Sequence, residues 1–373
     1  MLLGGLKRRL SHALVRTTTA ADAFPDADWR PVLESETAEF GEIVAPAFAP
    51  EAAHLEANRY ATPRAVTARL RGALYYSYLN VLVTPRRSIV LDTDNTYLEH
   101  AATPAGERFY WRSLYRRPVE DIAGTSFVFR SPANNFYHTL IDNLPRLYAL
   151  HQTRYRGVPI TLLVPSGLTP YEDHFLSRLL PDNVTIRRLE RDRLYRLEAV
   201  IFSSYLSRQM SGYLPSAYLR FFLEATLPSR PRRKTHRIYI TRGSSRVGRR
   251  VANEAEVQRL LERFGFRSHA LEELPLAAQI ELFFDAEAVV GVHGAGLTNL
   301  LFADRAAVVE LHPCRTVFPH YYFLCRAMGH RYRFLCSDEA TRHSDLSVDT
   351  GALEACLLEL FEPPRASVRS ASA

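Results

Sequence analysis

The sequence is short of several features that would define its class at once. It has 4 cysteines in 373 residues and no CxxC pair, which excludes a disulfide scaffold and the usual zinc-finger patterns. No apolar run reaches the ~18 residues that a transmembrane helix needs, because polar residues interrupt the longest stretches. What remains is an ordinary globular composition, with 47% apolar and 23% charged residues.

Lysine is almost missing as well. Lys7 and Lys234 are the two lysines among 47 basic residues, so the net charge of +7 comes from arginine. Such a ratio, beside many alanines, indicates a coding bias, and the charge alone therefore does not predict nucleic-acid binding. Arginine nevertheless favours bidentate contacts with phosphate and carboxylate groups, so clustered arginines are candidate binding residues.

The first 16 residues mix basic and apolar side chains without an apolar stretch long enough for a signal peptide. A docked terminal helix fits this pattern, and so does an amphipathic helix on an anionic membrane surface. We expect reduced thiols at the four cysteines: Cys314, Cys325, Cys336 and Cys356. A cytoplasmic location is therefore expected, with peripheral association at the inner face of the membrane as the alternative.

Strand and helix patterns alternate along most of the chain. From residue 125 onward they form a βαβ series, which predicts an α/β fold with a parallel sheet and helices on both faces. A stretch rich in proline and arginine at 228–233 predicts a linker before a second alternating series, in which Asn253 and Glu256 have the spacing of a helix capping box. The expected parts are an N-terminal lead-in (1–64), an acceptor-side domain (65–228), a Rossmann-like domain (229–345), and a C-terminal helix and tail (346–373).

A glycine-rich turn follows a buried apolar run in the second half. Residues 289–299 read VVGVHGAGLTN, a strand that stops at a turn from which a helix starts. Gly294 and Gly296 would let a ligand approach the backbone, and the free amides at a helix start suit a phosphate. The glycine spacing matches neither GxGxxG nor a Walker motif. Tight packing of strand against helix, with His293 as a satisfied polar residue, is the alternative.

Residues 230–250 contain nine basic side chains and no acidic one. Arg242 follows a predicted strand, so Arg242, Arg246 and Arg249 would lie at the carboxyl edge of the same sheet as the glycine turn. Two groups that favour phosphate at one edge indicate a diphosphate site. A solvated basic loop and a nucleic-acid-binding surface are the alternatives, and the latter would lose affinity steeply with salt.

Carboxylates also stand at three further places that matter for chemistry. Glu310 ends an apolar strand, where a carboxylate accepts ribose hydroxyls in dinucleotide folds or forms a structural ion pair. His138 and Asp142 share one helix face at i, i+4 and could remove a proton from a hydroxyl, although helix capping and surface pairing explain them equally well. Asp92 and Asp94 form an Asp-x-Asp after an apolar run, which is either a divalent-metal site or turn chemistry.

Three of these stretches, taken in order, resemble glycosyltransferase family 61. They are residues 135–146 (NFYHTLIDNLPR), residues 238–242 (IYITR) with Arg249 and Asn253-Glu254, and residues 291–299 (GVHGAGLTN). Together they span about half of the chain, from roughly residue 125 to 315. The more general similarity outside this region is to bacterial members that act in capsular or exopolysaccharide synthesis.

The resemblance implies a GT-B-like fold, in which two Rossmann-like domains face each other across a cleft. It implies an inverting transferase without metal or other cofactor, which moves a sugar from a nucleotide-sugar donor, a UDP-sugar, to a glycan or surface polysaccharide and does not use nucleic acid. A metal-dependent transferase using Asp92 and Asp94 is the alternative within enzymes.

The resemblance also implies roles for individual residues. Asp142 is the first choice for the catalytic base and His138 the second, with Asn134, Asn135 and Arg146 on the acceptor side. The residues implied for the donor are Arg242, Arg246, Arg249, His293, Gly294, Ala295, Gly296, Leu297, Thr298, Asn299 and, at the ribose, Glu310.

Overall fold

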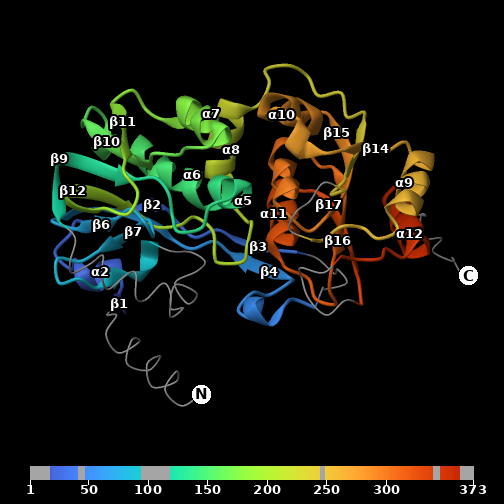
Figure 1. Ribbon diagram of the computed structural model, residues 1–373, viewed down its shortest axis with the longest axis horizontal. Coiled ribbons are helices and arrows are strands. Elements are labelled where there is room, and N and C mark those ends of the chain that lie inside the picture. The colour runs from blue at the N-terminus through green and yellow to red at the C-terminus, as the bar shows by residue number, and fades with distance from the viewer. Residues whose placement is uncertain (1–16, 41–46, 94–117, 244–247, 339–344, 362–373) are drawn as a thin grey trace, which may run out of the picture. The chain divides into compact units, whose positions relative to one another are not determined.

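The structure is a computed structural model that describes residues 17–40, 47–93, 118–243, 248–338 and 345–361 (Figure 1). Contacts divide the chain into two compact units. The first unit consists of residues 61–209 with parts of 1–38 and 214–226, and the second of residues 227–373 with 39–60 and 210–213. Both units combine helices with parallel strands, which confirms the α/β class. In the described ranges no helix is long and apolar enough to cross a membrane.

The first unit is built around four parallel strands. They are β9 (Val119–Val128), β10 (Ile160–Pro165), β11 (Val184–Leu189) and β12 (Leu194–Ser203). Their order in the sheet is β11-β10-β9-β12. The chain adds β10 and β11 on one side of β9 and then places β12 on the other side, so the strand order reverses between β9 and β12. In open α/β sheets such a reversal opens a crevice at the carboxyl ends of the two strands.

Six further strands, mostly antiparallel to their neighbours, extend this sheet to ten strands, so the sheet is mixed rather than parallel throughout. Short turns join β6 to β7 and β7 to β8, and strands joined in this way pair antiparallel. The added strands are β1 (Thr17–Thr18), β2 (Arg30–Leu33), β5 (Ala65–Arg71), β6 (Leu74–Tyr76), β7 (Val81–Val83) and β8 (Ile89–Val90). Residues 17–60, which show no clear periodicity, thus supply β1 and β2 to this sheet. The short strands β3 (Thr37–Glu39) and β4 (Arg59–Ala61) form a separate two-stranded sheet.

The sheet of the first unit bends sharply. In β9, Gly124 has a φ of 79°, and the register of β12 against β9 shifts between Leu197 and Ala199. Glycine takes this left-handed conformation without a steric cost, and such bulges bend a strand. As a result, Tyr75 from β6 and Leu163 from β10 are buried in one apolar cluster. The antiparallel part of the sheet therefore folds over toward the parallel part.

The second unit has a five-stranded, fully parallel sheet in the order β14-β13-β15-β16-β17. These strands are β13 (His236–Ile240), β14 (Arg267–His269), β15 (Ala286–Val292), β16 (Ala307–His312) and β17 (Arg331–Cys336). Helices α10 (Leu276–Phe284) and α11 (His320–Met328) cover one face, and α9 (Glu254–Arg263) and α12 (Thr350–Phe361) cover the other (Figure 1). The strand order reverses between β13 and β15, which defines the crevice of this sheet.

One local prediction needs correction. Asn253 precedes α9 but makes no capping hydrogen bond to it; its side chain instead pairs with the backbone of Val348, with its Nδ2 donating to O at 2.9 Å and its Oδ1 accepting from N at 3.0 Å. The helix predicted after Gly294 is present as a 3-10 helix, η7 (Ala295–Phe302). A further helix that the sequence pattern did not indicate, α8 (Ser216–Thr226), lies in the first unit.

A buried histidine gives the second unit an expected sensitivity to acid. His330 accepts a hydrogen bond from Ala306 N at Nδ1 (3.0 Å) and donates from Nε2 to Leu300 O (3.0 Å), which fixes the neutral ring. Burial lowers the pKa of His330 to about 4, from 6.5. Since the unfolded chain takes up this proton at higher pH than the folded chain, the free energy of unfolding should fall as pH drops from about 6.5 toward 4.

We expect urea unfolding to show a loss of about 2 kcal/mol between pH 7 and pH 5 from this residue. The control is His330→Asn, which keeps an acceptor for Ala306 N but does not titrate. It should be less stable at pH 7 and lose less stability on acidification. Equal losses in the two proteins would contradict the assignment to His330.

Candidate active site

The crevice of the second unit holds the glycine-rich turn and two arginines. Arg242 follows β13, and His293 follows β15, so both lie at the carboxyl ends of the two strands between which the order reverses. Arg242 Nη1 donates to His293 O at 3.3 Å, and Arg249 Nη1 donates to the same carbonyl at 2.8 Å. Two guanidinium groups from one loop thus converge on the turn after β15.

Gly294 leaves room for this convergence. A Cβ atom at Gly294 would lie 2.2 Å from Arg242 Nη1, so the Arg242 guanidinium would have to move. The backbone there is extended, so backbone strain does not call for glycine. Burial lowers the pKa of Arg242, and a bound anion would offset this cost of burying a cation. We name the site formed by Arg242, Arg249 and the turn His293–Gly294 the arginine cradle.

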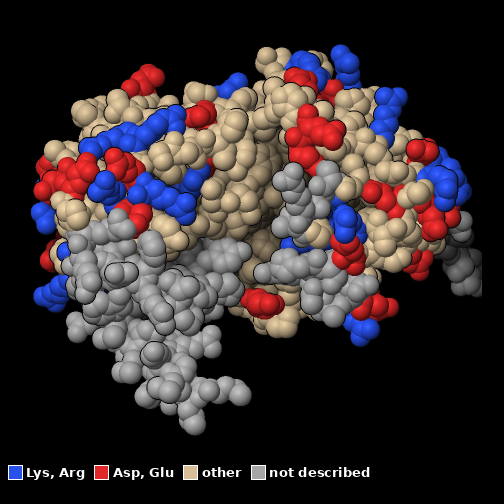
Figure 2. Space-filling view, viewed as in Figure 1, with Lys and Arg blue, Asp and Glu red and all other residues tan. Residues whose placement is uncertain are grey.

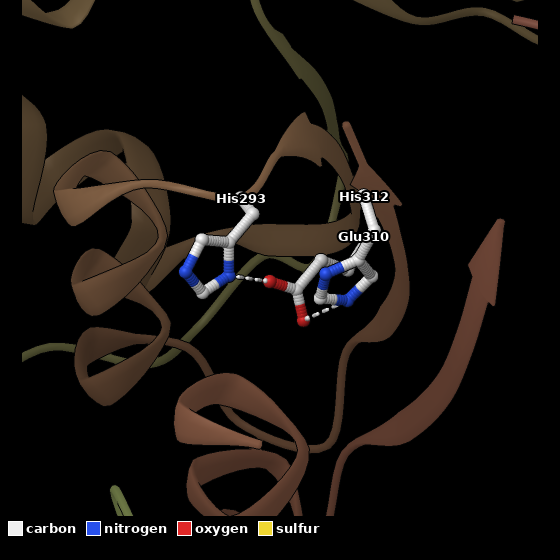
Figure 3. Close-up of side chains that lie close together, drawn as sticks. All are labelled: His293, Glu310 and His312. Carbon is white, nitrogen blue, oxygen red and sulfur yellow. Dashed lines mark hydrogen bonds and ion pairs between the residues drawn. The ribbon is translucent and has the colours of Figure 1, made fainter. Parts of the chain in front are cut away.

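Behind the cradle lies a buried network centred on a carboxylate (Figure 3). Glu310, on β16, accepts a hydrogen bond from His293 Nδ1 at Oε1 (2.6 Å) and one from the Tyr332 hydroxyl at Oε2 (2.6 Å). His312 Nε2 lies 3.4 Å from Oε2. Glu310 is 0% exposed, and both of its oxygens are engaged within the protein.

The protonation states in this network follow from burial and charge. Burial acts to raise the pKa of Glu310, but His312 and His293 outweigh it and bring that pKa below its usual range. Burial lowers the pKa of His293. Glu310 is therefore a carboxylate beside a neutral His293, whose Nδ1–H it accepts, and the lone pair of that ring is then on Nε2.

The geometry of Glu310 does not favour the ribose contact that its position on the strand suggested. A carboxylate whose two oxygens already accept short hydrogen bonds from His293 and Tyr332 presents no oxygen to a ligand. Carboxylates in this position commonly fix the tautomer and orientation of a histidine. In the structure, Glu310 does this for His293.

The same residues are the group in the described chain that could ligate a metal ion. Each of three residues offers one possible ligand atom, and these atoms lie within 4.8 Å of one another; the residues are His293, Glu310 and His312. A cation there would have to replace the 2.6 Å bond between His293 and Glu310, and the Tyr332 hydroxyl occupies the other oxygen. The donor set therefore fits hydrogen bonding better than metal binding.

Most of the basic residues at 230–250 are paired inside the second unit. Arg230 contacts Asp285 and Glu281, and Arg232 donates to the carbonyls of Phe284 and Phe302. The other ion pairs of the stretch are Lys234–Asp304, Arg237–Glu287 and Arg250–Asp345. On the face seen in Figure 2, basic and acidic groups are likewise interspersed. The stretch is thus not a solvated basic loop; Arg242 and Arg249 reach the cradle, and Arg246 lies outside the described residues.

The first unit carries the His138–Asp142 pair. His138 Nδ1 and Asp142 Oδ2 are 2.6 Å apart, and the residues are 7% and 3% exposed. Their helix starts at α5 (Phe136–His138), where Asn135 is the N-cap and accepts from His138 N at 3.0 Å. It continues as a five-residue π-helix, η3 (Thr139–Asn143), directly before Leu144 and Pro145. Proline lacks the N–H of a regular helix, which explains the irregular turn.

Arg146 has a different place from the one predicted. Its guanidinium donates to the carbonyls of Val128, Phe129 and Ser203, at 3.1, 3.4 and 3.3 Å. These carbonyls lie at the carboxyl ends of β9 and β12, so Arg146 joins the two strands where the order reverses. This buried arrangement favours a structural role over an acceptor contact. By contrast, Asn134 and Asn135 are exposed at the start of the helix.

The Asp-x-Asp pair cannot be judged as a pair, because Asp94 lies outside the described residues. Asp92 Oδ2 accepts a hydrogen bond from Ala20 N at 2.5 Å, at the start of α2 (Ala20–Ala23). Asp92 thus bonds the start of a helix that is distant in sequence, and the turn expected at Asp94 lies outside the described residues.

Sequence reasoning missed two members of the Glu310 network. His312 could have been found, since residues i and i+2 of a strand share a face. Tyr332 could not, because its place beside Glu310 depends on β17 pairing with β16.

A parallel sheet with a glycine-rich turn and two arginines at its order reversal is typical of a domain that binds a nucleotide or another phosphate ligand. The comparison with known proteins agrees and goes further. The sequence profile of the family Glycosyltransferase 61 matches residues 136–309, from the start of α5 to β16.

A curated relative is the EGF domain-specific O-linked N-acetylglucosamine transferase of Drosophila melanogaster. It is 34% identical over 124 residues, which are 31% of this chain and 23% of that protein. The chain thus matches about a quarter of the length of this relative. Together the two comparisons support a place for this chain in glycosyltransferase family 61, and with it the activity of a glycosyltransferase.

Proposed function

We propose that this protein is an inverting, metal-independent glycosyltransferase that uses a nucleotide-sugar donor. The observation that carries the proposal is the convergence of Arg242 and Arg249 on the turn at His293–Gly294. The His138–Asp142 pair in the first unit adds a candidate base. In this proposal the two α/β units are the two halves of a GT-B arrangement.

The donor site is the arginine cradle. A nucleoside diphosphate leaving group gains negative charge as the bond to the sugar breaks, and two guanidinium groups with the start of η7 stabilise that charge. Guanidinium groups match phosphate oxygens geometrically. Cations fixed by the protein make a bound metal ion unnecessary, and a UDP-sugar is the donor we expect.

His293 is the third donor-site group, and Glu310 positions it. Because Nδ1 is bonded to Glu310 Oε1, the other ring nitrogen, Nε2, is the one that can interact with a ligand. A diphosphate beside Nε2 favours a proton on that nitrogen, which would then be a hydrogen-bond donor to a phosphate oxygen. Glu310 stabilises the resulting imidazolium across the 2.6 Å bond.

The acceptor hydroxyl is deprotonated by the His138–Asp142 pair. As the hydroxyl oxygen forms its bond to the anomeric carbon, the bond to the diphosphate breaks and the hydroxyl proton passes to the base. Asp142 is our first choice for this base, with His138 bonded to it. His138 Nε2 is the second choice, with Asp142 as the orienting group.

The acceptor is a glycan or surface polysaccharide, which would place the protein in the cytoplasm or at the inner face of the membrane. The named relative acts on EGF domains. We do not extend that acceptor to this chain, because the match covers 23% of the relative.

The test is thermal unfolding with a panel of nucleoside diphosphates, each with and without EDTA. A ligand at about 100 times its dissociation constant stabilises a folded protein by roughly 2.7 kcal/mol. We expect one diphosphate, UDP first, to raise the unfolding temperature equally with and without EDTA. The matched control is Arg250→Ala, a basic residue of the same stretch that is paired with Asp345 and should keep the response.

The other outcomes separate the alternatives. A response that EDTA removes would support a metal-dependent transferase and return attention to Asp92 and Asp94. No response to any diphosphate would overturn the donor site.

A further inference from the structure

A cavity of about 430 Å³ lies within the first unit, and of the residues given a role above only Asn134 lines it. Its size falls in the range of small-molecule binding sites. Three of its walls are formed by residues at or just beyond the carboxyl ends of the parallel strands β9, β10 and β11. The fourth wall is the turn after β6. The lining residues that matter below are Tyr75, Ser77, Tyr78, Asn80, Asn134 and Arg191.

The bend of the sheet creates this cavity. Because the antiparallel part folds over the parallel part, the turn after β6 faces the carboxyl ends of β10 and β11. The two sides are tied together: Ser77 Oγ donates to Glu190 O at 2.8 Å and accepts from Arg193 N at 2.9 Å. Carboxyl ends of parallel strands and the mouths of curved sheets are preferred ligand sites.

The polar lining is pre-formed. Tyr75 is buried, and its hydroxyl donates to Asn80 Oδ1 at 2.8 Å. Asn80 has a φ of 56°, a left-handed conformation in which asparagine is enriched. The turn is thus fixed in one shape by its own sequence, and the Asn80 amide is held at the cavity wall.

The charged side chains at the cavity are directed to partners of their own. Arg130 is bonded through Nε and Nη2 to the buried carboxylate of Glu172, and Glu190 is paired with Arg193 at 2.8 Å. The Arg191 guanidinium lies over the Tyr78 ring, 5.1 Å from its centroid. Unlike the arginine cradle, where two guanidinium groups converge on one turn, the cavity does not suit a phosphate group.

The other residues that line the cavity carry amide, hydroxyl and aromatic groups. Asn80, Asn134 and Ser166 offer donors and acceptors, while the partly exposed Tyr78 offers ring surface. A neutral, polyhydroxylated ligand uses both: its hydroxyls pair with the amides, and its C–H faces pack on the rings. We propose that this cavity binds a neutral saccharide of one or two rings.

The cavity is linked to the His138–Asp142 pair through the loop that leads into their helix. Asn134 lines it, and the next residue, Asn135, caps the helix that presents His138. Ser131 N, on the same loop, donates to Asn143 Oδ1 at 2.9 Å, one residue beyond Asp142. His138 is thus about one helical turn from the cavity wall. This part of the inference rests on the proposed function: the saccharide is the acceptor, held beside its base.

Saturation-transfer NMR on the full chain tests the site without activity. The probes are the methyl glycosides of glucose, galactose, mannose, N-acetylglucosamine and xylose. We expect at least one to receive saturation from the wild-type protein, and UDP not to displace it. Tyr78→Ala and Asn80→Ala should weaken that binding by about fivefold or more, as expected for loss of a ring contact or a hydrogen bond.

The matched control is Tyr148→Ala. Tyr148 is a partly buried tyrosine of the same unit that contacts Tyr218 and Phe221 and does not line the cavity. Its removal should leave glycoside binding unchanged. If no glycoside binds, or if the cavity variants bind as well as the control, the saccharide site is wrong. The remaining outcome is that a glycoside binds in this cavity while no nucleoside diphosphate stabilises the protein. That pair of results would support the saccharide site and contradict the proposed transferase function.

Discussion

Asp142→Asn is expected to lower the rate of sugar transfer by about a thousandfold or more and to leave the affinity for nucleoside diphosphate unchanged. The substitution keeps the size of the side chain but removes the carboxylate that receives the acceptor proton. The proposed donor site is built in the second unit from Arg242, Arg249 and His293, whereas Asp142 belongs to the first unit and is paired with His138. Steady-state kinetics together with calorimetric titration of the diphosphate separate the two effects.

His138→Gln distinguishes the two assignments of the base. If Asp142 is the base, His138→Gln should retain much more activity than Asp142→Asn. If His138 is the base, both variants should lose activity to a similar extent. The surface control is Asp173→Asn, whose exposed carboxylate is 3.4 Å from Arg188 and should be dispensable. Normal turnover in Asp142→Asn, or collapse of diphosphate binding, would show that Asp142 is not the base.

The second unit could be predicted closely from its sequence. Parallel strands covered on both faces are buried throughout, and β15 and β16 are accordingly near-continuous apolar runs. The turn after β15 was visible because a strand, glycines and a helix follow one another within a few residues. Its partner Arg242 was visible for the same reason, as the first charged residue after a strand.

The first unit could be predicted only in part. Its parallel strands were visible from their apolar runs, but the bend at Gly124 and the short strands within 17–60 leave little periodic signal. The role of Arg146 depends on which carbonyls β9 and β12 bring together, and that is a property of strand order. The cavity depends on the same bend, which places the turn after β6 opposite strands that are far from it in sequence.

Glu310→Gln is expected to lower the affinity for nucleoside diphosphate and for inorganic pyrophosphate together, by about 10- to 100-fold. The glutamine amide has one oxygen and one NH2 group, whereas both Glu310 oxygens accept from donors, His293 Nδ1–H and the Tyr332 hydroxyl. Either the Tyr332 hydroxyl turns to accept from the NH2 group or His293 loses its acceptor. In both cases the neutral amide no longer stabilises the protonated His293 ring that a bound diphosphate favours.

The choice of ligands separates this positioning role from a contact with the ribose. A residue that bonds the ribose affects uridine and UDP but not pyrophosphate, whereas a residue that positions His293 affects every ligand with a diphosphate and spares uridine. Tyr332→Phe is the companion variant: it removes one hydrogen bond but keeps the carboxylate, so its effect should be in the same direction and smaller. Unfolding temperatures without ligand show whether each variant is folded. Because the two roles predict opposite results for pyrophosphate, calorimetry of one folded variant with that ligand decides whether Glu310 acts on the donor directly or through His293.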